Sequence, residues 1–391
     1  MKKKFTIIAS ALAAVLLIVA VVVIAMGPYD ERGLEYTVNA DGVTCTITGV
    51  GSCKTKKLKI PEYMDGYKVT AIGKNLFYGY GAFFNNNNEG PVYSKLKKVT
   101  IPDSVTSIGA GAFYGCNQLT EITLPSGLKS LGTAAFYNCT ELKNASLPDT
   151  LESLGDAVFY NCQKLEKMTI PDSITKIGSG MFYDCYVLTS VSFSENVTEI
   201  GELAFYGCGS LTEFTIPDGV KKIENWTFAH CTSMKKITVP DEITYIGERA
   251  FSSCVNLEKF DIPSHVQEIG IYAFYECKKL KEIDLPDSLT TLGAYAFDSC
   301  RALTSVKLSD SLTAIENRIL NNCSALETLT IPASVQKIGS AILASSAIKT
   351  VYYEGTVEQW NAVEKAATWS SVTNLTEVVC SDGTVSPKTT E

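Results

Sequence analysis

Ten of the 13 cysteines are evenly spaced along the sequence, each as far from the next as Cys116 is from Cys139. They are Cys116, Cys139, Cys162, Cys185, Cys208, Cys231, Cys254, Cys277, Cys300 and Cys323. Thiols form disulfides, bind soft metal ions and act as nucleophiles, so this series is the first candidate for chemistry. The constant interval also means that each cysteine occupies the same place in a repeated unit. A period of about 20–50 residues is typical of solenoids, propellers and arrays.

Stacked units favour a packing role for these cysteines. Equivalent residues of stacked strands lie about 4.8 Å apart, which is within the Cα range of a disulfide. Side chains in register point the same way, however, so their Cβ atoms are too far apart and the dihedral angle is wrong for a disulfide. A straight column also has no centre where thiolates could close around a metal ion. We therefore interpret the series as small buried apolar residues. Cys45 and Cys53 lie outside the series and could pair, and Cys380 looks single.

Apolar residues recur in columns with the same period. The unit from Leu119 to Glu141 reads LTEITLPSGLKSLGTAAFYNCTE. Its L-x-x-I-x-L segment contains a short alternating strand, whose last two apolar residues point inward. Proline ends the strand because it cannot donate to a ladder, and an aspartate after it favours a tight turn. A second apolar pair, a glycine and Phe-x-x-Cys complete the unit.

Gly, Asn or Asp precedes the cysteine in six of the ten units, and these residues tolerate a positive φ. A sharp bend is therefore predicted before each cysteine. One unit alone buries too few apolar groups to offset the entropy of ordering its chain. The units must therefore fold as a stacked array.

The consensus L-x-x-I-x-L-P-x-x-[VL]-x-x-[IL]-G-x-x-A-F-x-x-C resembles the BspA-type leucine-rich repeat, which occurs on surface proteins of anaerobic bacteria and some parasitic protists. The resemblance covers about Leu96 to Tyr353, with an irregular first turn from Leu58 to Tyr80. It implies a right-handed leucine-rich-repeat solenoid, mostly β with irregular and turn connections, capped at both ends. It also implies a role in binding, because relatives are associated with host proteins and other cells.

The columns and the chain ends predict five segments. Thr356-Val357-Glu358-Gln359 fits a capping box, which predicts a short helix through about Ala366, with Trp360 sealing the end of the solenoid. The segments are 1–27, a signal-anchor or signal peptide; 34–57, a β-rich N-terminal cap; 58–353, a solenoid of about 12 turns; 354–380, a C-terminal cap with the short helix; and 381–391, a loose tail.

The N-terminal segment predicts export. Lys2 to Lys4 precede a stretch without charges that runs from Phe5 to Met26. A bilayer span needs about 20 residues and a signal-peptide core about 7–15. The stretch reaches the first length, so an uncleaved anchor fits better, although cleavage after Ala25 is conceivable. Both cases send the rest of the chain outside. We expect an extracellular or cell-surface protein held by an N-terminal transmembrane segment, or secreted if cleaved.

Composition and motifs argue against two function classes. The formal net charge of −8 is unlike the basic face of nucleic-acid-binding proteins, so no nucleic acid is expected. His230 and His265 stand in different units, and no catalytic or phosphate-binding motif is present, so we predict no enzyme and no cofactor. The aspartates after proline occur only once per unit, which fits turn capping better than calcium binding, so no metal site is predicted.

Two surfaces are candidates for binding. Strand residues between the inward columns form the concave face, where leucine-rich repeats usually bind; β-propensity on a wetted face would produce the same residues. Tyrosines after the repeated phenylalanine would offer a large area at low entropy cost, unless they form a packing ladder. The concave-face candidates are Lys167, Glu213, Lys236, Lys259, Asp261, Glu282, Asp284 and Lys307, and the tyrosine strip is Tyr114, Tyr137, Tyr160, Tyr183 and Tyr206.

The sequence therefore predicts a cell-surface recognition or adhesion module. Its expected partner is a protein or glycan, on a host or on a neighbouring cell, and the membrane is contacted through the N-terminal segment. The alternative is a structural surface protein with no specific ligand. The identity of the ligand and the oligomeric state do not follow from the sequence.

Overall fold

The computed structural model describes residues 33–51, 56–77, 95–370 and 374–387. The predicted N-terminal segment and Cys53 lie outside these ranges. Within them, no helix is long and apolar enough to span a bilayer. The chain divides into two compact units, 1–158 and 159–391.

The first unit is built of short strands: β1 (Glu35–Val38), β2 (Thr44–Gly49), β3 (Lys57–Lys59), β4 (Tyr63–Met64), β5 (Tyr67–Ile72), β6 (Lys98–Thr100), β7 (Ser107–Ile108), β8 (Glu121–Thr123), β9 (Ser130–Leu131) and β10 (Ser153–Leu154). β1 and β2 pair antiparallel within the predicted N-terminal cap, and β4 folds back on β5. Two parallel ladders follow, β3–β6–β8 and β5–β7–β9–β10, and they take one strand each from a repeat turn.

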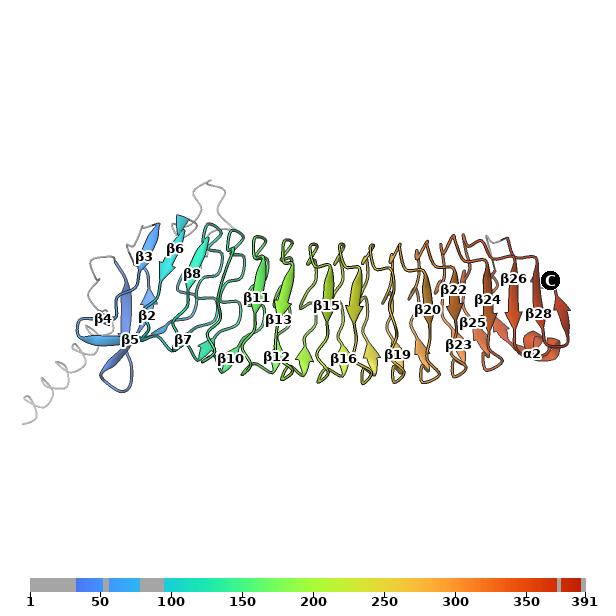
Figure 1. The fold of residues 1–391 in the computed structure, drawn as a ribbon, viewed down its shortest axis with the longest axis horizontal. Helices are drawn as coiled ribbons and strands as arrows, with labels where there is room; N and C mark the ends of the chain where they lie inside the picture. Colours follow the sequence, from blue (N-terminus) through green and yellow to red (C-terminus); the bar gives the residue numbers. More distant parts are fainter. Residues whose placement is uncertain (1–32, 52–55, 78–94, 371–373, 388–391) are drawn as a thin grey trace, which may run out of the picture. The chain divides into compact units, whose positions relative to one another are not determined.

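The second unit is a β-solenoid with two series of parallel strands, drawn as separate rows of arrows in Figure 1. The first ladder comprises β11 (Lys167–Thr169), β13 (Ser190–Ser192), β15 (Glu213–Thr215), β17 (Lys236–Thr238), β20 (Glu282–Asp284), β22 (Ser305–Lys307), β24 (Thr328–Ile331), β26 (Thr350–Tyr353) and β28 (Glu377–Cys380). The second ladder comprises β12 (Lys176–Ile177), β14 (Glu199–Ile200), β16 (Lys222–Ile223), β18 (Tyr245–Ile246), β19 (Glu268–Ile269), β21 (Thr291–Leu292), β23 (Ala314–Ile315), β25 (Lys337–Ile338) and β27 (Glu364–Lys365).

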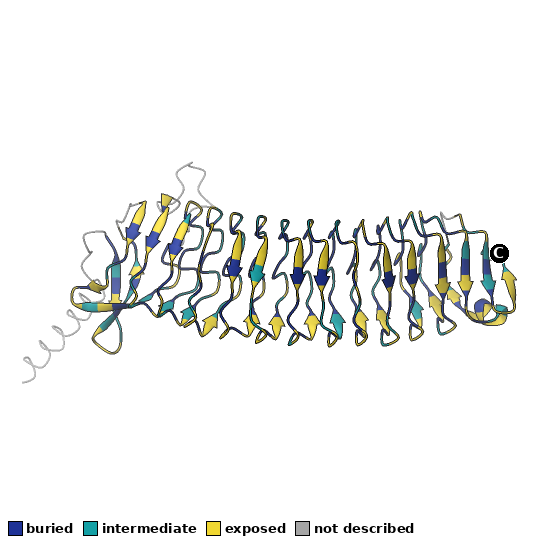
Figure 2. Ribbon diagram, viewed as in Figure 1, coloured by how far each residue is buried: buried dark blue, intermediate teal, exposed yellow. Residues whose placement is uncertain are grey.

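Alternation along the first ladder follows the sequence pattern. In β15 and β17 the central residue is buried and its two neighbours are exposed, and Figure 2 shows this as dark centres between exposed ends. The following proline ends the strand and its carbonyl closes a turn, as Pro217 O does by accepting the Val220 N–H at 3.0 Å. The predicted strand-and-proline unit is therefore confirmed.

The third side of each turn, from the repeated glycine to the cysteine, uses left-handed residues at two places. The residue before each ladder cysteine has a φ between 54° and 73°, even where it is His230 or Glu276. A second left-handed residue stands four positions earlier, in the series Gly111, Ala134, Ala157, Gly180, Leu203, Trp226, Arg249, Tyr272, Tyr295 and Arg318. The first bend was predicted. The second was missed because its residue types give no sign of a positive φ.

These bends let alternate N–H groups of the third side point at the next turn. Gly180, Phe182 and Asp184 donate to carbonyls of the following turn, at distances of 2.9, 2.8 and 2.7 Å. The N–H groups between them close tight turns within their own turn, as the Cys185 N–H does on Phe182 O. The third side is thus a ladder of hydrogen bonds without regular strands.

The core contains the predicted phenylalanine and cysteine columns. Phe159, Phe182 and the phenylalanines that follow in their column to Phe297 are 0% exposed, and neighbouring rings of this unit stack with centroids 5.3–5.9 Å apart. The first unit has its own stack, in which Phe113 lies 5.3 Å from Phe136. The inward direction of this column is confirmed.

The ladder cysteines are buried thiols, as the packing interpretation predicts. Their sulfurs also donate hydrogen bonds, which was not predicted: Cys208 Sγ lies 3.2 Å from Phe182 O, and Cys231 Sγ lies 3.2 Å from Phe205 O. Each acceptor is the phenylalanine carbonyl of the preceding turn. Burial raises the pKa of Cys254 and of Cys323 to about 12, so both stay protonated at neutral pH.

The C-terminal end differs in two details from the prediction. α2 (Val357–Ala362) starts at the expected capping box of Thr356 and Gln359 but ends before Ala366, because Glu364 and Lys365 pair with β25 instead. Trp360 is buried, as expected. The prediction of a loose tail from Ser381 is wrong for β29 (Gly383–Val385), because this strand pairs antiparallel with β28.

Candidate binding surfaces

The eight predicted concave-face residues all lie exposed on the first-ladder side of the second unit, which we call the charged face. Glu213 of β15 stands in register with Lys236 of β17, and Asp284 of β20 with Lys307 of β22. Opposite charges on neighbouring strands attract each other. Lys167 of β11 has Ser190 as its register partner and stands apart from the other charges.

The middle of the charged face carries an ion pair. Lys259 Nζ lies 3.0 Å from Asp261 Oδ1, in the turn between β17 and β20. The hydrogen bond and charge of Asp261 raise the pKa of Lys259, and Glu282 and Asp284 add to the effect. Exposed pairs of this kind contribute only about 0–1 kcal/mol to stability. These charges therefore remain available to a partner.

The predicted tyrosine strip is half-buried and stacked. In the first unit Tyr114 and Tyr137 have centroids 4.6 Å apart with an interplanar angle of 3°. In the second unit Tyr183 lies 4.2 Å from Tyr160 and 4.5 Å from Tyr206. Parallel rings at these distances cover each other's faces and leave edges and hydroxyls to the solvent. This geometry fits a packing ladder, in which the stacked ring faces are closed to a sugar.

A mixed aromatic and cationic column was missed. The left-handed residues Trp226, Arg249, Tyr272, Tyr295 and Arg318 recur with the period of the repeat. The Arg249 guanidinium lies 4.6 Å from the Trp226 ring centroid and 4.3 Å from that of Tyr272, and Tyr272 stacks on Tyr295 at 4.5 Å. The period is visible in the sequence. The changing residue types hide that these side chains form one row.

Between the turn that carries β13 and the turn that carries β15, backbone hydrogen bonds of the described chain are formed on the third side and not along the two strand ladders. β13 pairs with β11, and β15 pairs with β17, but neither first-ladder strand pairs with the other. The second ladder is interrupted at the same place, between β14 and β16. Within the second unit as described, this is the one step where both ladders stop, and we call it the open step.

Hydrogen bonds at the two neighbouring steps show what the open step lacks. Thr189 N–H donates to Glu166 O at 2.9 Å, and Lys235 N–H donates to Thr212 O at 2.8 Å. The equivalent bond from Thr212 N–H to Thr189 O is not formed in the described chain. On the third side the bonds continue, and Phe205 N–H donates to Thr227 O at 2.9 Å.

A side chain explains the gap in the second ladder. At a paired step, glycine brings two turns close: a Cβ on Gly247 would lie 2.7 Å from Asn225 N and from Glu224 C. The open step has Glu224 in place of that glycine. Among the solenoid turns from Gly201 to Gly339, one other turn lacks this glycine and has Glu316 in its place. The second ladder is also unpaired at that turn, between β21 and β23.

Two phenylalanines occupy the first-ladder side of the open step. Phe193 stands where neighbouring turns have Ile170 and Ile216, and Phe214 follows in the next strand. Their ring centroids lie 5.6 Å apart. Val191, at the centre of β13, is partly exposed, whereas the equivalent centres of β11, β15 and β17 are buried. Bulky rings at this level thus accompany a core that opens toward the solvent.

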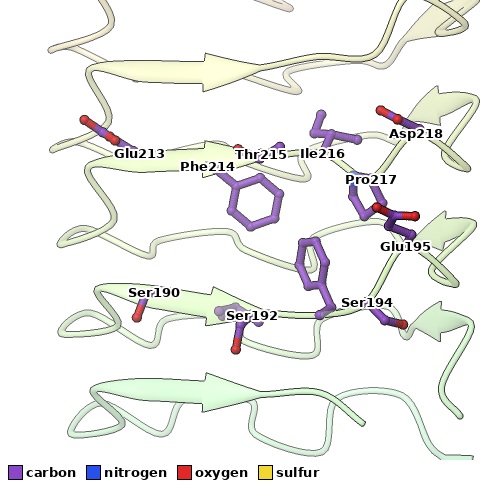
Figure 3. A pocket seen from close by; sticks show the side chains of 12 residues that line it. Ser190, Ser192, Ser194, Glu195, Glu213, Phe214, Thr215, Ile216, Pro217 and Asp218 are labelled. Carbon is purple, nitrogen blue, oxygen red and sulfur yellow. The ribbon is translucent and has the colours of Figure 1, made fainter. Parts of the chain in front are cut away.

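The open step forms a groove of about 420 Å³ on the first-ladder side. In Figure 3 the Phe214 ring points from β15 toward the strand that carries Ser190 and Ser192. Glu195, Pro217 and Asp218 lie together beyond the ends of the strands. A second opening, also of about 420 Å³, lies at the same step on the second-ladder side, near Lys222 and Glu224.

Comparisons with known proteins agree with this architecture. A family model described as BspA type leucine rich repeat region matches residues 92–212, 152–270 and 245–363. A leucine rich cell surface protein from Faecalibacterium prausnitzii is similar in structure, with 28% sequence identity, 87% of this chain and 97% of the other covered, and a TM-score of 0.58.

A leucine-rich repeat protein from Bacteroides ovatus is similar at 25% identity, with 89% of this chain and 98% of that chain covered and a TM-score of 0.62. A search among curated proteins gave no match. The family model covers more than half of the chain. The chain therefore belongs to the BspA-type leucine-rich repeat family.

Proposed function

We propose that the protein is a cell-surface recognition or adhesion module that binds a protein partner through the charged face and catalyses no reaction. The main support for this proposal is that all eight charged candidates are exposed on one side of the second unit. Mixed charges on a solvent-exposed sheet give specificity and fast association with a protein of complementary pattern. Lys259 and Asp261 lie at the centre of this arrangement.

Surface display is part of the same proposal. Three lysines followed by an apolar stretch support export, and the similar Faecalibacterium protein is described as a cell surface protein. We retain residues 1–27 as the proposed anchor or signal peptide and residues 58–353 as the proposed solenoid. A glycan partner has less support than a protein partner, because the tyrosine rings cover one another.

The test starts with capture of a partner from arrays of matrix proteins and glycans by the full chain. Charge reversal at Lys236, Lys259, Asp261 and Asp284 is then expected to weaken binding by about 10- to 100-fold, since buried charge pairs at interfaces are costly to break.

A control with the same net charge reverses four exposed second-ladder residues, Lys222, Lys337, Glu199 and Glu268. It should leave the affinity within about twofold, as is usual for charges outside an interface. If the charged-face variant binds as well as the control, the charged face is not the site. If the arrays yield no partner, the alternative of a structural surface protein gains support.

A further inference from the structure

We propose that the groove at the open step is a docking site for an extended peptide segment of a partner protein that carries lysine or arginine. The site differs from the charged face, with which it shares only Glu213. It was not visible as a unit in the sequence, because its walls come from two turns of the solenoid.

Unused backbone groups are the first support. At the flanking steps, Ile170 N–H donates to Ser192 O at 2.8 Å and Ile216 N–H donates to Thr238 O at 3.0 Å. In the described chain the equivalent N–H of Phe193 makes no such bond to Thr215 O. The facing edges of β13 and β15 therefore present donors and acceptors with the spacing of a strand. Extended peptides bind such edges through their main chain.

The lining of the groove defines the side chains of the occupant. Of its twelve described lining residues, none carries a positive charge, whereas Glu195, Glu213 and Asp218 are exposed carboxylates. The floor is apolar, with Phe193, Phe214 and neighbouring aliphatic groups. Lysine and arginine combine a cation with an apolar stem, so they suit both parts of this surface.

The rings do not favour a sugar in this groove. Phe214 is 6% exposed, and its ring contacts the rings of Phe193, Phe205 and Phe228 with centroids 4.8–5.6 Å apart. The Phe214 ring is therefore closed to stacking by a pyranose. The exposed Ser190 hydroxyl of β13 can instead donate to a peptide carbonyl.

The first experiment measures binding of blocked hexapeptides to the full chain by calorimetry. The probes are Lys-Val-Lys-Val-Lys-Val, its glutamate counterpart and an N-methylated form of the lysine peptide. The lysine peptide is expected to bind at least about tenfold more tightly than each of the others, because charge-assisted and main-chain hydrogen bonds are lost in them. Equal affinities for the three peptides would overturn the proposal.

Site assignment uses two matched variants. Glu195→Gln with Glu213→Gln and Asp218→Asn should weaken the lysine peptide by at least about tenfold. Asp241→Asn with Glu242→Gln and Glu268→Gln removes the same charge from exposed residues elsewhere and should change affinity by at most about twofold. Similar losses in both variants would mean unspecific attraction to an acidic protein and would contradict the groove site.

Hydrogen exchange provides a readout that depends on the backbone. The segment with Phe193 and the segment with Thr212 should exchange more slowly when the lysine peptide is bound. A closed variant, Phe193→Leu with Phe214→Ile and Glu224→Gly, has residues found at equivalent places of other turns and should lose binding as these segments become protected. Binding by a variant that shows this protection would overturn the proposal.

Two further outcomes are decisive. Saturable binding of cellohexaose that is lost in the Glu195, Glu213 and Asp218 variant, without binding of the lysine peptide, would assign the groove to a sugar and reject the peptide. The charged-face variant changes none of the groove residues. Failure of the groove therefore leaves the proposed function standing, and failure of the charged face leaves the groove standing.

Discussion

The step from β15 to β17 and the open step from β13 to β15 use the same core columns but differ on their surfaces. Both have stacked phenylalanines and a cysteine thiol bonded to the preceding turn. The β15–β17 step also pairs both ladders and has Gly247, whereas the open step has Glu224 and two facing phenylalanines. The core thus joins successive turns, and close backbone approach on the other two sides depends on small residues at particular places.

The largest effect is expected from the shared core. Phe205→Ala should lower the free energy of unfolding by about 3–5 kcal/mol, because the ring is fully buried. Phe193→Ala, at the edge of the open step, should cost less than about 1.5 kcal/mol because its ring is partly exposed. Chemical denaturation measures both. Equal losses would mean that the open step is packed as tightly as the core.

A methyl group should loosen the closed step. Gly247→Ala is expected to lower the free energy of unfolding by about 1–3 kcal/mol, because the added Cβ would meet the backbone of the preceding turn. Gly209→Ala is the matched control, since its Cβ would come no closer than 3.6 Å to other atoms and should change stability by less than about 1 kcal/mol. If both substitutions behave alike, backbone approach does not explain the paired ladder.

The reverse change should tighten the second ladder. Glu224→Gly removes the obstructing Cβ, and the hydrogen bonds gained should slow amide exchange around Lys221 by about five- to tenfold. Glu316→Gly should act in the same way between β21 and β23. Unchanged exchange in both variants would show that something other than this residue keeps these ladders apart.

The smallest difference is expected at the thiols. Cys231 borders the open step and Cys254 does not, yet both donate to a phenylalanine carbonyl at 3.2 Å. Alkylation without denaturant should modify both at rates within about twofold of each other and far more slowly than in the unfolded chain, because only the thiolate reacts. Mass spectrometry of the alkylated peptides reports both rates. Fast labelling of Cys231 alone would show that the third side opens too.

The same thiols predict the sensitivity to alkali. Burial raises the pKa of Cys254 from 9.0 to about 12, so the folded state holds its proton more firmly than the unfolded state. This contribution to stability is complete below pH 9 and is lost as the pH rises toward 12. Urea midpoints measured from pH 8 upward should therefore fall above about pH 9. A flat profile would contradict the burial of the ladder.

The repeat columns could be predicted because each residue type is confirmed by its equivalents one period away on either side. Phe182, Cys208 and the proline turns follow directly from that period. The open step could not be predicted in this way, although Phe193, Phe214 and Glu224 are each visible as exceptions. They matter because two successive turns place them at one step. Likewise, the period places Tyr183 beside Tyr206 but does not say that their ring faces pack together.

The second left-handed position of the third side has an evolutionary consequence. An L-residue there costs about 1–2 kcal/mol that glycine avoids. Gly111 and Gly180 occupy it in two turns, but Trp226, Arg249 and Tyr295 occupy it in others. Drift toward stability alone would favour glycine throughout. Large side chains kept here among relatives would therefore indicate selection for what this row presents to its surroundings, independently of selection on the core.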